Sequence, residues 1–308
     1  MKTFAIIVPV YNEEDIIQDF FSVLLKAIKK IDTKKYKTRI IFINNGSTDK
    51  SIAFLKKLYN QNNNVSVLTL SKNFGYQNSL YFALKNIKAD IYNFIDIDCE
   101  DPPLLINNFI KKYEEGFDIV YGERVDRHEF FILKKARNQF YKIVKLLADD
   151  EIILYMAEFC LISREVRNAV IDEVNSFPFI RSNISRVGFN SFGIKYKRDK
   201  RIGGKTHYNI LSMIVFATAG ILTSSTIFLR LPIYFLFLAS LFLIINMFND
   251  FFDHQYVFNF LIYMIYFTVS FMAIYVARIY KNQFLRPNAY LYKKNTFIGC
   301  KDFFEFNE

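Results

Sequence analysis

Two aspartates, Asp96 and Asp98, close an apolar run that begins at residue 91 and stops before Pro102-Pro103. The run is rich in β-branched and aromatic residues, which is typical of a buried strand, and the proline pair prevents that strand from continuing. Side chains two positions apart in extended chain point the same way, so both carboxylates can face one object. Their hard oxygens suit Mg²⁺ or Mn²⁺ together with phosphate oxygens. The pattern therefore indicates either a cation site or a solvated acidic turn.

Basic side chains gather in two stretches, and the whole chain carries a formal net charge of +10 at pH 7. This balance predicts a polyanionic partner such as nucleic acid, an anionic membrane face or a phosphorylated substrate. Basic runs are most often solvated faces, but the second stretch adjoins the apolar part of the chain, which favours a phosphate or headgroup over nucleic acid. The stretches are Arg124, Arg127, Lys134, Lys135, Arg137, Lys142 and Lys145, then Lys195, Lys197, Arg198, Lys200, Arg201 and Lys205.

Several common kinds of site are excluded by the sequence. No G-x-G-x-x-G follows the first predicted strand and no G-x-x-x-x-G-K-[ST] occurs, so neither a dinucleotide-binding turn nor a P-loop is expected. The three cysteines have no C-x-x-C spacing and the three histidines have no metal-binding spacing, so no zinc site is expected. A nucleotide would therefore be held by polar side chains at strand ends and by a metal.

The residues around these groups alternate between strand and helix patterns. This order predicts an α/β fold with a mostly parallel sheet, in which ligands bind beyond the carboxyl ends of the strands. Asn12 is a candidate N-cap of the first helix, and Ser47 or Asp49 of the second. The expected strands are 3–10, 39–44, 65–70, a strand that begins at 91 and ends in the acidic residues, and 118–121. The helices after the first four strands are expected to end near residues 30, 59, 86 and 114.

Two stretches without a charge, 231–248 and 256–277, are each long enough to cross a bilayer. The loop between them carries Asp250 and Asp253, and basic residues flank the pair on both outer sides. The positive-inside rule places both basic flanks in the cytoplasm, so we expect a multi-pass protein of the inner (cytoplasmic) membrane. The stretch 210–229 is rich in Ser, Thr and Gly and is expected to lie on the membrane, because a third crossing would put the basic tail outside.

Short motifs occur along the chain in an order that resembles the family-2 glycosyltransferases. Within that family the chain resembles the polyprenyl-phosphate glycosyltransferases, which are dolichol-phosphate-mannose synthase-like or bacterial GtrB-like. The resemblance covers nearly the whole chain, including the two uncharged stretches 231–248 and 256–277. The motifs are Val8-Pro-Val-Tyr-Asn-Glu-Glu14, Ile43-Asn-Asn-Gly-Ser-Thr-Asp49, Ser71-Lys-Asn-Phe-Gly75, Asp96-Ile-Asp-Cys-Glu-Asp-Pro-Pro103, Val120-Tyr-Gly-Glu-Arg124, Leu161-Ile-Ser-Arg164 and Arg201-Ile-Gly-Gly-Lys-Thr-His-Tyr208.

The resemblance implies a GT-A type fold, a nucleotide-sugar donor, a divalent cation (Mg²⁺ or Mn²⁺) and a polyprenyl phosphate acceptor at the lipid bilayer. It implies that Asp96, Asp98 and Glu100 contact the metal. The implied donor-binding residues are Pro9, Tyr11, Glu13, Asn44, Asn45 and Asp96. The expected parts of the chain are a cytosolic catalytic domain (1–207), juxtamembrane interfacial helices (208–230), two transmembrane helices (231–280) and a cytosolic basic tail (281–308).

The implied reaction moves one sugar, with a UDP-hexose favoured as donor, and inverts the anomeric carbon. A lipid phosphate is largely a dianion at neutral pH and needs positioning more than a strong base. Arginine suits this task because its planar fork binds phosphate oxygens in pairs. The predicted acceptor-phosphate residues are Arg124, Lys134, Arg137, Arg201 and Lys205, and the predicted catalytic residues are Asp98, Glu158 and Arg124.

The chain departs from the family pattern at three positions. Asn44 and Asn45 replace two acids, and Cys160 replaces an arginine. An Asn amide can both accept from and donate to a base, so uridine is compatible and guanine or cytosine stays open. Two further interpretations also stay open: a transferase that extends a lipid-linked saccharide, and an inactive sugar-nucleotide-binding membrane partner. A homo-oligomer is a further expectation.

Overall fold

The computed structural model describes residues 1–125, 153, 156–173, 178–199, 227–249, 253–283, 287–299 and 301–304. The chain divides into two compact units, of which the first is Met1–Ala136 with Ile152–Tyr208 and Pro287–Glu308. The second unit is Arg137–Glu151 with Asn209–Arg286. The C-terminal segment, predicted only as a basic tail, is thus part of the first unit.

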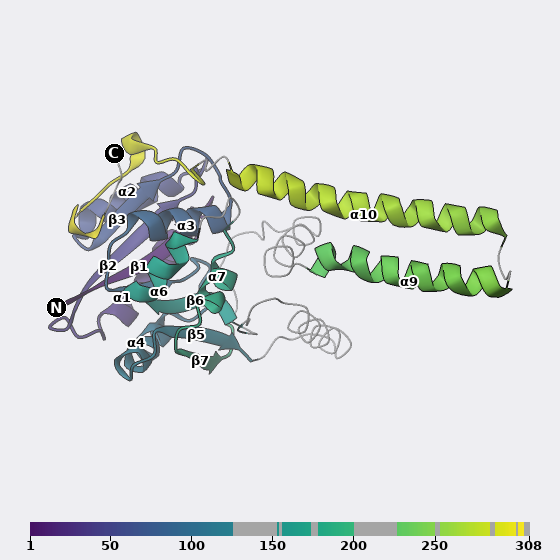
Figure 1. The fold of residues 1–308 in the computed structure, drawn as a ribbon. Coiled ribbons are helices and arrows are strands. Elements are labelled where there is room, and N and C mark those ends of the chain that lie inside the picture. Colours follow the sequence, from purple (N-terminus) through teal and green to yellow (C-terminus); the bar gives the residue numbers. More distant parts are fainter. Residues whose placement is uncertain are drawn as a thin grey trace. The chain divides into compact units, whose positions relative to one another are not determined.

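A seven-stranded sheet with the order β3-β2-β1-β4-β6-β5-β7 forms the centre of the first unit (Figure 1). Neighbouring strands are parallel except where β6 pairs with β4 and β5, so β6 alone runs the other way. The predicted α/β fold with a mostly parallel sheet is confirmed. The strands are β1 Lys2–Val10, β2 Tyr36–Asn44, β3 Val65–Thr69, β4 Ile91–Phe94, β5 Ile119–Arg124, β6 Met156–Ser163 and β7 Ser191–Tyr196.

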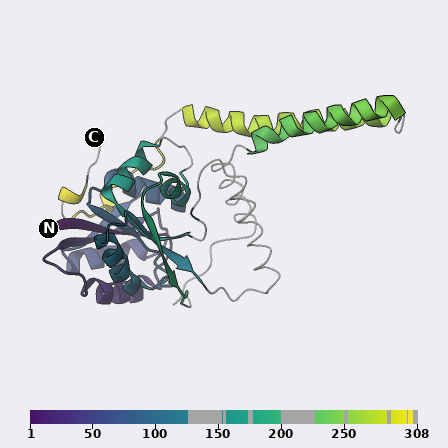
Figure 2. The same cartoon turned by 60° about the horizontal axis from the view of Figure 1, so that its bottom comes forward.

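Helices cover both faces of this sheet (Figure 1 and Figure 2). Successive residues of β1 point to opposite faces, Phe4 and Ile6 into one core and Ala5 and Ile7 into the other. Strands buried on both faces need apolar residues at most positions, which explains the long apolar runs in the sequence. Ser66 of β3 and Asn93 of β4 are buried polar exceptions. The first core includes side chains of α1 Ile17–Ile28, α2 Ser51–Gln61 and α4 Ile106–Glu114, and the second includes side chains of α3 Tyr76–Asn86, α6 Arg164–Asp172 and α7 Ile180–Arg186.

Local structure differs from the sequence prediction at the helix starts. Asn12 does not cap α1, which begins at Ile17 without a side-chain cap; Asn12 has φ 54° and its Oδ1 accepts the N–H of Thr48 at 2.8 Å. Ser47 does not cap α2 either, because its Oγ accepts the N–H of Asn12. Asp49, the other candidate, does contact the start of α2, because its Oδ1 accepts the N–H of Ser51 at 2.9 Å. Asn12 and Ser47 instead join the loops after β1 and β2.

The C-terminal segment 287–304 closes the outer edge of β3. Val67 and Phe297 exchange two backbone hydrogen bonds of 2.8 Å, and Ser71 donates its N–H to the carbonyl of Tyr290 at 2.9 Å. Short 3-10 turns at Lys293–Asn295 and Lys301–Phe303 let the segment follow the domain surface, and the Phe303 side chain is completely buried in the second core. An uncovered edge strand is an aggregation hazard, so this segment also protects the sheet.

Phe303→Ala is expected to lower the free energy of unfolding by about 3–5 kcal/mol, because truncating a fully buried Phe leaves a cavity. Chemical denaturation of the full chain in detergent measures this loss. Tyr292→Ala is the matched control, since Tyr292 belongs to the same segment but is 43% exposed. Equal losses in the two variants would contradict the core role of Phe303.

Two long helices, α9 Ile227–Asn249 and α10 His254–Gln283, form the described part of the second unit. The ring pairs Phe235–Phe267 and Phe242–Phe260, with centroids 5.5 and 5.6 Å apart, show that the helices run antiparallel. Among the described residues one helix, over Gln255–Ala277, is long and apolar enough to cross a membrane; the apolar part of α9, Pro232–Ile245, is shorter. Helices thus occupy both predicted spans, whereas the stretch 210–229 lies outside the described residues.

Candidate active site

One edge of the sheet brings together polar groups from four strands. The parallel strands β1, β4, β5 and β7 end at this edge, and β6 begins there because it runs the other way. Asp96 therefore follows the end of β4, Arg124 and Tyr196 end β5 and β7, and Glu158 lies near the start of β6. This edge is where open α/β sheets bind ligands.

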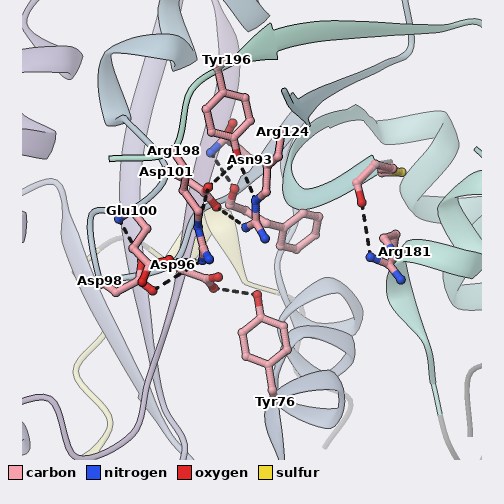
Figure 3. A network of polar contacts seen from close by, with 12 residues as sticks. Tyr76, Asn93, Asp96, Asp98, Glu100, Asp101, Arg124, Arg181, Tyr196 and Arg198 are labelled. Carbon is pink, nitrogen blue, oxygen red and sulfur yellow. Dashed lines mark hydrogen bonds and ion pairs between the residues drawn. The ribbon is translucent and has the colours of Figure 1, made fainter. Parts of the chain in front are cut away.

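The acidic residues lie on a loop and not in a strand. Asp96 and Asp98 were expected in extended chain at the end of the strand, but β4 ends at Phe94, and Cys99 adopts a φ of 58° in the loop that follows. The prediction that Asp96 and Asp98 point the same way because they alternate along a strand is therefore wrong, since neither residue is in a strand. Both nevertheless make polar contacts at this edge (Figure 3): Asp96 Oδ1 accepts the Tyr76 hydroxyl at 2.7 Å, and Asp98 Oδ1 accepts the N–H of Glu100 at 3.1 Å.

Asp101 is a completely buried carboxylate at the end of the same loop. Arg124 donates to its Oδ2 at 2.8 Å, and the Tyr196 hydroxyl donates to its Oδ1. Arg124 Nε also donates to the Tyr196 hydroxyl at 3.0 Å, which closes a three-membered network between the loop, β5 and β7. Burial alone would lower the pKa of Arg124, but Asp101 and Tyr196 raise it above its ordinary value, so this guanidinium stays charged.

Arg198, two residues after β7, contacts three carboxylates of the acidic loop. Its Nη2 is paired with Glu100 and lies 3.9 Å from Oδ2 of Asp98. Its Nε lies 3.8 Å from Oδ1 of Asp101. The N–H of the next residue, Asp199, donates to the backbone carbonyl of Glu100 at 2.9 Å, so backbone and side chain both join this segment to the loop.

The carboxylates of the acidic loop are ligands of the type that hard divalent cations prefer. Burial, and after it the charges of Asp101 and Asp98, raise the pKa of Asp96 to about 7 against the opposing hydrogen bond from Tyr76. Such mutual repulsion is relieved by a cation with oxygen preference, which points to Mg²⁺ or Mn²⁺. No group of three His, Cys, Asp or Glu side chains in the described part of the chain is arranged to hold a metal. Glu100 is paired with Arg198 here, and its role as a ligand stays a prediction.

Asn44 and Asn45 at the end of β2 are both buried and support loops. Asn44 Oδ1 accepts the N–H of Ser47 at 3.1 Å. Asn45 donates to Asn73 Oδ1 and accepts the N–H of Phe74, each at 3.0 Å. The two amides thus shape the turn after β2 and fasten it to the loop 71–75, and a contact with a nucleotide base stays a prediction.

The other predicted donor-binding residues lie around the end of β1. Pro9 is in β1 opposite Ile43 of β2, and Tyr11 directly follows the strand. Glu13 donates its backbone N–H to Ser51 Oγ at 2.9 Å, which joins this turn to the start of α2. The structure places these residues at the ligand-binding edge, and their contact with a donor stays a prediction.

Glu158 is held by Gln77 of α3, which donates to its Oε1 at 3.1 Å. The carbonyl oxygen of the Gln77 side chain in turn accepts the N–H of Ile180 at the start of α7. Cys160, which replaces an arginine of the family pattern, is buried opposite Phe94. Burial raises the pKa of its thiol well above the ordinary value. Cys160 is therefore a packed thiol, with no charge to offer an acceptor.

Sequence reasoning missed part of this site. Tyr76, Gln77 and Tyr196 carry no local signal, since only the fold brings their side chains to the carboxylates. Asp101 was part of a quoted motif and Arg198 part of a basic run, but neither was assigned a role. Four predicted acceptor residues lie outside the described residues: Lys134, Arg137, Arg201 and Lys205.

Gly46 is expected not to tolerate a side chain, because it has φ +71° and a Cβ would lie 2.4 Å from the backbone carbon of Lys72. We expect Gly46→Ala to lower stability by more than about 2 kcal/mol and to raise the KM for the donor, since the loop 71–75 must shift. Gly188→Ala is the control: its φ is also +71° but nothing lies within 4 Å, so only backbone strain of about 1 kcal/mol is expected. Thermal unfolding and donor titrations measure both variants, and a Gly46→Ala chain as stable as Gly188→Ala would contradict this packing.

The chain is similar in sequence to known glycosyltransferases. The family model described as Glycosyl transferase family 2 matches residues 5–216. An uncharacterized glycosyltransferase of Bacillus subtilis, YkcC, is 32% identical over 75% of this chain and 71% of its own length. The bactoprenol glucosyl transferase of Shigella phage SfV is 31% identical over 77% of each chain. Among solved structures, the glucosyl-3-phosphoglycerate synthase of Mycobacterium tuberculosis in complex with uridine-diphosphate is 18% identical over 72% of this chain and 79% of that chain, with a TM-score of 0.49.

Proposed function

Because the chain belongs to glycosyl transferase family 2, we propose that it transfers one hexose from a nucleoside diphosphate donor to a polyprenyl phosphate, with inversion of the anomeric carbon. The observation that carries this proposal is the edge where Asp96 and Asp98 lie beside Arg124 and Arg198. The relatives named as bactoprenol glucosyl transferases support a polyprenyl phosphate acceptor and a glucosyl donor. UDP-hexose is the donor that we favour.

The leaving group in this reaction is a nucleoside diphosphate, whose charge must be neutralised as it departs. A bound Mg²⁺ or Mn²⁺, held by Asp96 and Asp98, would supply that neutralisation. Arg124 is oriented by Asp101 and Tyr196 and would orient the acceptor phosphate for attack. Glu158, held by Gln77, would direct the acceptor without having to act as a strong base.

The C-terminal segment supports a specific membrane arrangement. Residues 287–304 pair with β3 of the first unit, so they lie on the same side of any membrane as the sheet. The chain between residues 199 and 287 must then cross an even number of times. We therefore assign crossings to both α9 and α10, with the sheet and the C-terminal segment in the cytosol, and the stretch 210–229 on the membrane surface.

The proposal is tested with the full chain in detergent, undecaprenyl phosphate and a panel of UDP-, GDP- and CDP-sugars, with products identified by mass spectrometry. We expect one hexose on bare undecaprenyl phosphate, dependent on Mg²⁺ or Mn²⁺. Product formed only on a lipid-linked saccharide would indicate a chain-extending transferase. Donor binding without turnover on any acceptor would indicate an inactive binding partner.

A further inference from the structure

Two arginines face the acidic loop 96–101, and they differ in how firmly they are held. The Arg124 side chain is 18% exposed and donates hydrogen bonds of 2.8 and 3.0 Å. The Arg198 side chain is 35% exposed, and its approaches to Asp98 and Asp101 are 3.9 and 3.8 Å, which are ion-pair and not hydrogen-bond distances. The buried Nε of Arg198 has no hydrogen-bond partner in the described residues. Arg124 is fixed, whereas Arg198 is held mainly by Glu100.

The two arginines neutralise different carboxylates of the loop. Asp101 is already satisfied by Arg124 and the Tyr196 hydroxyl. The charge of Arg198 is therefore left for Glu100 and Asp98, two of the three residues predicted to contact a cation. Figure 3 shows the Arg198 guanidinium directed at the end of the loop that carries Asp96 and Asp98. A divalent cation between these aspartates would face a positive charge next to it, and like charges this close repel strongly.

We infer that Arg198 is an exchangeable internal counter-cation, which neutralises Asp98 and Glu100 while no divalent cation is bound and is displaced when one binds. The inference rests on the proposed function, because it takes Asp96 and Asp98 as the residues that hold the cation. The backbone bond from Asp199 to Glu100 keeps the segment after β7 next to the loop while the side chain moves. Arg198 is thus a positioning residue, since its release gives Glu100 to the cation and leaves a guanidinium within reach of the donor phosphates.

The test measures Mn²⁺ binding to the full chain in detergent, with and without nucleoside diphosphate. The electron paramagnetic resonance signal of free Mn²⁺ reports how much of the ion remains unbound. If Arg198 competes with the cation, Arg198→Gln binds Mn²⁺ alone roughly tenfold more tightly than the unaltered chain, a usual size for coupling between two ligands. Arg198→Lys keeps the charge and is expected to stay within about threefold of the unaltered chain. Loss of a merely structural arginine would weaken Mn²⁺ binding or leave it unchanged.

Arg164→Gln is the matched control, because Arg164 is also paired with a carboxylate, Asp90 at 2.7 Å, but at the opposite end of β4. It removes the same charge and should leave Mn²⁺ affinity unchanged. If Arg198→Gln does not fold, Arg198→Met, which keeps the apolar stem, replaces it. If the unaltered chain binds Mn²⁺ as tightly as Arg198→Gln or Arg198→Met, the inference about Arg198 is wrong but the proposed cation site stands. If no variant binds Mn²⁺, even with nucleotide present, the proposed cation site is wrong as well.

Discussion

Asp98→Asn is expected to reduce glycolipid formation by roughly 10³-fold, because a carboxylate that holds the cation contributes several kcal/mol to neutralising the leaving diphosphate. The change is small for the fold. Asp98 Oδ1 accepts one backbone N–H at 3.1 Å, and the amide oxygen of Asn can accept the same bond. A radiolabelled-sugar assay on membranes that contain the full chain measures the loss, with thermal unfolding of the purified chain as a check on folding.

Asp90→Asn is the control for Asp98→Asn. Asp90 also lies next to β4, but at the start of the strand, where it accepts hydrogen bonds from Thr3 and pairs with Arg164. We expect this variant to keep activity within about threefold, since it changes the net charge equally without touching the ligand-binding edge. Full activity of Asp98→Asn would remove the carboxylate from the mechanism.

Asp101→Ala is expected to lower the free energy of unfolding by about 3–5 kcal/mol, because it leaves the largely buried charge of Arg124 without its partner. The expected loss of stability is larger than the net contribution of the Asp101–Arg124 ion pair, because the variant also leaves the charge of Arg124 buried without a partner. Chemical denaturation of the full chain measures it. The double variant with Arg124→Met should recover part of the loss, as it removes the stranded charge.

A single Asp101→Ala variant as stable as the unaltered chain would contradict this account of the network. So would a double variant less stable by the sum of the two single losses, because that result would mean that Asp101 and Arg124 act independently. Both variants should lack activity, since Asp101 and Tyr196 orient Arg124 at the edge of the sheet.

The parallel half of the fold can be predicted from the sequence because most residues of a strand that is covered on both faces are apolar. All five predicted strands exist, and the motif positions of Asp96 and Asp98 are at the predicted edge. The strand boundary was less readable. Ile95 and Ile97 continue the apolar pattern but pack into the core from a loop, so hydrophobicity alone extended β4 beyond Phe94.

The missing strands and contacts depend on tertiary structure. Strand β6 has the same apolar character as its neighbours, and no local feature reveals that it runs antiparallel and so presents Glu158 at its start. The partners of Asp101 lie 23 and 95 residues away in sequence. Asn12 was misread because its side chain can cap a helix or join two loops, and only the fold decides between the two.

The closure of β3 by residues 287–304 also sets an order for biosynthesis. These residues are made after the segments of α9 and α10, when the other strands of the sheet have long been available. Domains fold as their chain emerges, so the sheet must wait with one open edge and without Phe303 until these residues have been made. We expect that the newly made chain passes through an aggregation-prone stage that chaperones must cover, and that stop codons after residue 286 leave it there permanently.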